Sequence, residues 1–69
     1  MPYVNIKITR EGVTIAHKER LIHGVTQLLV DVLDKDPNAT MVVIDEVDTD
    51  DWGWKGRSVS ALRRSERHT

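Results

Sequence analysis

Pro2 is the residue whose type and position point most directly to chemistry. A small side chain at the second position generally permits removal of the initiator Met1, and the chain then begins with a secondary amine outside any peptide bond. A free α-amine titrates at about 7.7 to 8.0, and burial or neighbouring cations lower that pKa toward neutrality, where a general base works best. Taken alone, Pro2 has two interpretations: a catalytic base, or, more commonly, a tolerated residue that only permits Met1 removal.

The remaining polar residues form no recognisable metal or cofactor motif. The chain has no Cys, which excludes thiolate zinc sites and disulfides. His17 and His23 are six residues apart on an expected helix, about 240° around its axis, so they cannot share a metal within one chain. P-loop, nucleophile-elbow and dinucleotide-binding patterns are also missing from the sequence. The sequence therefore predicts chemistry without metal or cofactor.

The charges nearly cancel, with 10 Lys and Arg against 11 Asp and Glu. Residues 31–51 hold eight of the acids, whereas residues 55–69 hold five bases. Because that basic stretch lacks interleaved aromatics, we expect no nucleic-acid partner. No uninterrupted apolar segment occurs in the first twenty residues, so we expect no signal peptide, no membrane partner and a cytoplasmic location.

Three periodic segments must position these residues. Residues 3–9 alternate apolar and polar side chains, the pattern of a half-buried strand. An apolar stripe at helical spacing follows Thr14, a suitable N-cap, and predicts a helix ending at about Leu33. Residues 40–47 contain a short apolar run that fits a buried strand. Strand, helix and strand in this order predict a β-α-β unit with parallel strands and one crossover helix.

The expected fold class is therefore a small α/β (α+β) protein, with one domain over residues 1–69 and a short polar, basic tail at about 58–69. A chain of 69 residues without disulfides struggles to bury enough apolar surface alone. One helix covers only one face of the sheet, and the second strand is apolar on both faces. We therefore expect a homo-oligomer.

The whole pattern resembles a known family. The matching segments span about residues 2–57 and comprise Met1–Ile8, Glu11-Gly12, the helix with Lys18 and Leu21-Ile22, Val42–Glu46 and Trp52–Gly56. Together they resemble the 4-oxalocrotonate tautomerase family. The resemblance implies a β-α-β protomer that dimerises into a four-stranded sheet, commonly with three dimers in a hexamer. It also implies a cofactor-free isomerase whose amino-terminal proline moves a proton in a small-molecule enol, dienol or 2-oxo acid, as in aromatic compound degradation.

By position, the resemblance implies that Pro2 is the catalytic proline. Trp52 falls where the family has an aromatic residue, usually Phe, that keeps the pocket apolar and the amine neutral. An equally common role for such a Trp is that of an interface anchor. Trp54 is a further candidate to enclose the pocket.

Two positions depart from the family pattern. Val13 follows the Glu-Gly turn where the family has an Arg that binds a substrate carboxylate, and Arg10 is the nearest guanidinium, so Arg10 is the expected substrate-binding residue. Met41 falls where a second Arg comes from an adjacent subunit. Lys55 and Arg57 are candidates to supply that charge, although a solvated surface position is the more common role for them.

The sequence thus favours a tautomerase with Pro2 as general base and a pocket shared between subunits. One alternative retains the scaffold but performs hydration, dehalogenation or decarboxylation of a small acid, with Asp45 or Asp51 as a second acid or base. Another is a non-enzymatic oligomeric binding module with a vestigial pocket, as Val13 and Met41 would allow.

Overall fold

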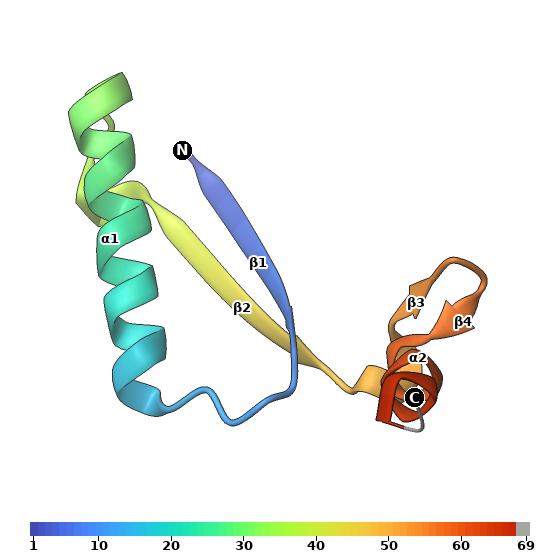
Figure 1. Cartoon of the computed structure of the whole chain (residues 1–69). Coiled ribbons are helices and arrows are strands. Elements are labelled where there is room, and N and C mark those ends of the chain that lie inside the picture. Colours follow the sequence, from blue (N-terminus) through green and yellow to red (C-terminus); the bar gives the residue numbers. More distant parts are fainter. Residues whose placement is uncertain (68–69) are drawn as a thin grey trace.

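The computed structural model describes residues 1–67 and has a β-α-β unit as its centre (Figure 1). Strand β1 (Tyr3–Thr9) pairs in parallel with β2 (Met41–Val47), in a register that runs from Tyr3 opposite Met41 to Thr9 opposite Val47. Helix α1 (Ile15–Leu33) connects them, and the short 3-10 turn η1 (Pro37–Ala39) precedes β2. The predicted fold class is confirmed.

Helix α1 begins and ends where its local sequence provides caps. The Thr14 hydroxyl accepts a hydrogen bond from the His17 backbone N–H at 3.1 Å, and the His17 Nδ1 accepts one from the Thr14 N–H at 3.2 Å. This reciprocal pair satisfies two amides that the first turn leaves without helical partners. At the other end Asp34 takes a left-handed conformation with φ 54°, which terminates the helix after Leu33 as predicted.

The chain after β2 folds into a hairpin and a second helix. The 3-10 turn η2 (Thr49–Asp51) leads into β3 (Gly53–Trp54), which pairs antiparallel with β4 (Arg57–Ser58). Both turn residues, Lys55 and Gly56, have positive φ, as two-residue hairpins require.

Helix α2 (Val59–Arg67) occupies most of the segment expected to be a polar tail. The Ser58 hydroxyl accepts a hydrogen bond from the Ala61 N–H at 3.1 Å and so caps its first turn. Val59 and Leu62 are one turn apart and line the same groove, which gives this short helix an apolar contact. The last two residues of the expected tail, 68–69, lie outside the described part of the chain.

The two faces of the β1–β2 sheet differ in cover. By the strand register Val4, Ile6 and Ile8 share a face with Glu46, whose carboxylate is bound by Lys18 of α1 at 2.8 Å. Helix α1 therefore covers this face. On the opposite face Tyr3 and Met41 are 62% and 50% exposed, so self-association has an uncovered face to act on.

The described chain is elongated and has no fully buried side chain among residues 1–66. Its radius of gyration is 16.0 Å, against about 11 Å for a compact domain of this length. Leu28, Val32 and Leu33 of α1 are also exposed. The apolar surface that the predicted homo-oligomer would bury is therefore present on both the sheet and the helix.

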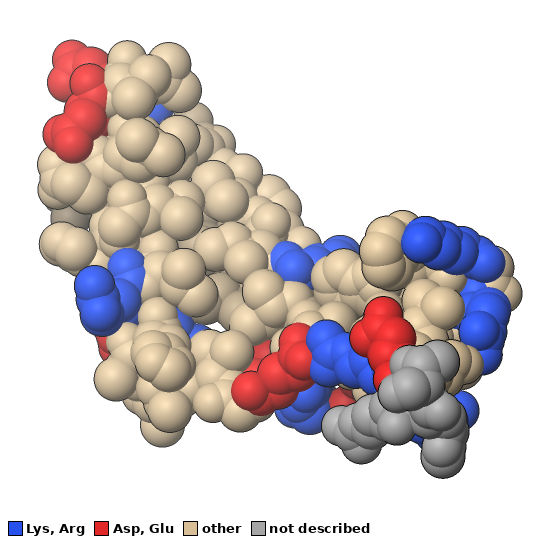
Figure 2. Space-filling view, viewed as in Figure 1, with Lys and Arg blue, Asp and Glu red and all other residues tan. Residues whose placement is uncertain are grey.

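Acidic residues gather over the C-terminal end of α1, and Lys and Arg gather around the β3–β4 hairpin and α2 (Figure 2). Acidic side chains also lie among these cations near α2. Between the two ends the surface in this view is mostly uncharged, with a few Lys and Arg side chains interrupting it. Within residues 1–67, neither helix combines the length and the apolar character that crossing a membrane requires.

Candidate functional site

Pro2 lies immediately before β1 and is half-buried. Its carbonyl oxygen accepts a hydrogen bond from the Met41 N–H at 3.0 Å, which extends the parallel ladder by one step. The residue is thereby attached to a regular element rather than to a loop, as precise positioning of a reacting group requires. Figure 1 shows this N-terminal end of the sheet on the side away from the hairpin and α2.

A groove with a volume of about 940 Å³ lies at the other end of β1, between the start of α1 and the C-terminal segment. Trp52 and Trp54 are its aromatic lining, and its aliphatic lining comprises Ile8, Val13, Leu21, Val59 and Leu62. The volume and the apolar character are those of a small-molecule site. The predicted pocket residue Trp52 is therefore placed in a cavity, together with Trp54.

One chain does not bring Pro2 to this groove. Pro2 and Ile8 are six residues apart along an extended strand, and at about 3.3 Å per residue they are separated by about 20 Å. Parallel pairing also places the beginning of β2 beside Pro2 and its end beside the groove. The proline and Trp52 can therefore meet only if two copies of the chain contribute opposite ends to one site.

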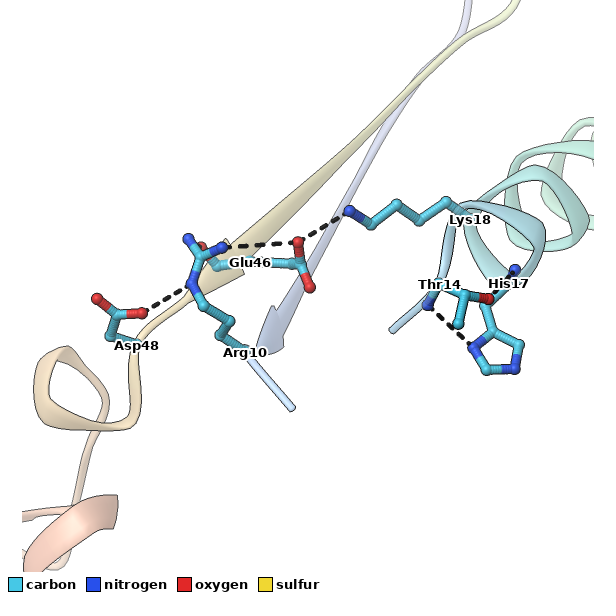
Figure 3. A network of polar contacts seen from close by, with 6 residues as sticks. All are labelled: Arg10, Thr14, His17, Lys18, Glu46 and Asp48. Atoms are coloured by element: carbon cyan, nitrogen blue, oxygen red, sulfur yellow. Dashed lines mark hydrogen bonds and ion pairs between the residues drawn. The ribbon is translucent and has the colours of Figure 1, made fainter. Parts of the chain in front are cut away.

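Arg10 belongs to an ionic network at the end of the sheet (Figure 3). Its Nε donates to Asp48 Oδ1 at 2.8 Å, its Nη2 donates to the Glu46 carbonyl at 3.2 Å, and its Nη1 lies 3.8 Å from Glu46 Oε2. The hydrogen bond from Lys18, with the charges of Lys18 and Arg10, holds the pKa of Glu46 below its usual value. This network joins β1, β2 and α1, and Arg10 is not among the residues that line the groove.

The other predicted charge donors also lie outside the groove lining. Lys55 sits over the Trp54 ring with its Nζ 4.5 Å from the ring centre, and Arg57 Nη2 donates to Ser65 Oγ at 3.1 Å. The cations that do line the groove are Arg20 and Arg63, which the sequence analysis missed. The sequence feature that could have identified Arg20 as a groove residue was its position on α1, one turn after His17 and next to Leu21.

Asp45 and Asp51, the candidates for a second acid or base in the alternative reactions such as hydration, have different surroundings. Asp45 Oδ2 accepts hydrogen bonds from Asn5 Nδ2 at 2.8 Å and Lys7 Nζ at 3.0 Å, and these contacts hold its pKa below the usual range. A carboxyl kept ionised in this way is a poor proton donor. Asp51 instead lines a smaller cavity beside Trp52.

These features define a class: a small β-α-β protein with a proline at the start of its first strand and an aromatic groove at the far end. A family model described as "Tautomerase enzyme" matches residues 2–62, and the chain belongs to this family. The resemblance seen in the sequence is thereby confirmed. Membership supports an isomerase activity of the tautomerase type.

Individual relatives agree with this assignment. A protein called probable tautomerase K2 from Dickeya dadantii (strain 3937) is 59% identical over 64 residues, covering 93% of this chain and 96% of its own. The crystal structure of DmpI from Helicobacter pylori matches with a TM-score of 0.86 and 45% identity, over 91% of this chain and 97% of that one. TomN, a 4-oxalocrotonate tautomerase homologue in the tomaymycin biosynthetic pathway, matches with a TM-score of 0.86 and 25% identity, over 94% and 98%.

Proposed function

We propose that this protein is a cofactor-free tautomerase of small enol or 2-oxo acids, with Pro2 as its general base. The amine of Pro2 takes the proton of an enolic hydroxyl. The electrons of the O–H bond then form the C=O bond, and the electrons of the C=C bond move to the carbon that does not carry the oxygen. That carbon takes the proton back from the Pro2 ammonium. The observation that carries the proposal is the half-buried position of Pro2 at the start of β1 in a chain of the tautomerase family.

The active site in this proposal is shared between subunits of a homo-oligomer. One subunit supplies Pro2, and another supplies the groove with Trp52 and Trp54. Two features support the arrangement: the separation of about 20 Å along β1, and the exposed apolar surface on the open face of the sheet. Closing an apolar groove over Pro2 removes water, which favours the neutral amine that a base requires.

Replacement of Pro2 tests the assignment directly. Pro2→Ala leaves a primary amine of different basicity and geometry, so ketonisation of phenylenolpyruvate or 2-hydroxymuconate should fall by at least about tenfold. Circular dichroism and the size of the oligomer in solution check that the variant folds. Equal rates for variant and parent would reject Pro2 as the base. A parent that does not accelerate ketonisation at all would favour a non-enzymatic binding module.

The mass of the intact protein provides an independent check. The proposal requires a free amine on Pro2, so the purified protein should lack Met1. A protein that retains Met1 has an amide at this position and cannot use it as a base. Such a mass, measured on an active preparation, would contradict the mechanism.

A further inference from the structure

The groove contains both cations and anions, and most of them are already paired. Glu11 accepts hydrogen bonds from Arg63 and from Thr9, and the bond from Arg63, followed by that from Thr9, holds the pKa of Glu11 below its usual value. Arg63 also experiences the charge of Glu66. The guanidinium of Arg63 is therefore engaged with carboxylates of its own chain.

Arg20 differs from Arg63 and Arg10 in this respect. It lines the groove on the α1 side, and no side-chain hydrogen bond or ion pair among the side chains of residues 1–66 includes it. His17 is three residues earlier, which places it on the same face of the helix, and it lines the same groove.

His17 adds a neutral donor next to that charge. Its Nδ1 accepts the hydrogen bond from the Thr14 N–H, so the proton of the neutral ring is assigned to Nε2. The groove wall formed by α1 thus carries one ring N–H and one guanidinium that has no side-chain partner in the described part of the chain. Facing elements supply Glu11, Arg63 and Glu66.

We infer that Arg20 is the carboxylate-binding residue of the groove and that the preferred substrate is a monoanionic acid with an apolar body. This inference rests on the proposed function. A guanidinium presents two parallel N–H groups to a carboxylate, while Trp52 and Trp54 present ring surface to an aryl or alkyl group. Met41 beside Pro2 is apolar, so a second carboxylate finds no cation there from the same strand.

The test compares Arg20→Gln with Arg64→Gln. Arg64 is an exposed arginine of α2 that does not line the groove, so both variants lose one surface charge. The probe is phenylpyruvate, whose dissociation constant is measured by saturation-transfer NMR, with its methyl ester as the uncharged probe. We expect Arg20→Gln to weaken phenylpyruvate binding by about tenfold or more, with Arg64→Gln and the ester nearly unchanged.

Each outcome decides the inference. Unchanged phenylpyruvate binding in Arg20→Gln, or equal weakening in Arg64→Gln, would overturn it, as would equal loss of acid and ester binding. Arg20→Lys should recover part of the affinity, because the charge returns without the paired geometry. Binding is measured at keto–enol equilibrium, so the dissociation constant does not depend on the catalytic rate. Failure of the Pro2→Ala test alone would therefore reject the proposed base and leave Arg20 as the anion site. Failure of the Arg20→Gln test alone would reject Arg20 as the anion site and leave Pro2 as the proposed base.

Discussion

The two ends of the β1–β2 sheet have opposite chemical character. At the Pro2 end the ladder closes with backbone hydrogen bonds, and the residues beside the proline, Tyr3 and Met41, are uncharged. At the far end Arg10, Lys18 and their carboxylate partners form a connected ionic network (Figure 3). Parallel pairing produces this separation, because it places both strand beginnings at one end and both strand ends at the other.

The difference explains why a proton-transfer site would need two copies of the chain. An amine base works near neutral pH when its surroundings are apolar, and the residues beside Pro2, Tyr3 and Met41, are uncharged. An anionic substrate needs a cation, and the groove end provides Arg20. In a single chain the proposed base and this cation lie at opposite ends of the sheet.

Mixing two damaged subunits gives the largest expected effect and tests this separation. Pro2→Ala should inactivate one end and Trp52→Ala the other, so each variant alone should show little activity. If subunits exchange randomly in pairs, half of the pairs are mixed and each mixed pair has one of two sites intact, giving about a quarter of the parental rate. The measurement is the rate of phenylenolpyruvate ketonisation after co-refolding the two variants.

A mixture that is no more active than its components would contradict the shared site. The control is the pair Pro2→Ala with Pro2→Ala,Trp52→Ala, which contains no intact proline and should gain nothing on mixing.

The ionic network predicts a smaller effect, on stability and its pH dependence. Glu46 has a pKa lowered from 4.5 by the hydrogen bond from Lys18, with further contributions from the charges of Lys18 and Arg10. A group whose folded pKa is depressed stabilises the protein above its unfolded pKa, and that stabilisation is lost as pH falls through the folded value. We expect Glu46→Gln to lower Tm at pH 7 and to reduce the decline in Tm below pH 4.5.

Differential scanning calorimetry from pH 3 to pH 7 at fixed protein concentration measures both effects, since oligomer stability depends on concentration. Asp48→Asn is the matched control, because it removes one exposed contact of Arg10 and leaves the link between Glu46 and Lys18 intact. An equal response of the two variants would show that Glu46 is not the centre of the network.

The same two ends differ in how well the sequence predicted them. The β-α-β unit was predictable from three local patterns: the strand alternation, the Thr14 cap and the apolar run at residues 41–44. Each of these patterns indicates one type of secondary structure without reference to distant residues. Pro2 was identifiable because its chemistry depends on position in the chain rather than on neighbours in space. Arg10 lies beside the groove end in sequence, but its guanidinium is held by Glu46 and Asp48.

The groove itself required the three-dimensional structure. It brings Ile8 and Val13 together with residues of α2 that are about fifty positions away in the sequence. Helix α2 was missed because its polar composition predicted a tail, whereas Val59 and Leu62 suffice for one apolar face. The pairing of Arg63 with Glu11 follows from that long-range contact.

The smallest effect that we predict concerns the start of α1, which carries His17 and Arg20 into the groove. Thr14→Ala removes the hydroxyl that accepts the His17 N–H, and loss of such a cap costs about 1 kcal/mol. The loss should appear as faster amide hydrogen exchange in the first turn of α1, while the last turn near Leu33 keeps its protection. Thr14→Ser retains the hydroxyl and should behave like the parent. Because the cap supports the groove wall and not the Pro2 end, phenylpyruvate binding should weaken slightly in Thr14→Ala while Met1 removal is unaffected. Uniform exchange along the whole helix would instead indicate that α1 opens as one unit and that the two ends are not independently stabilised.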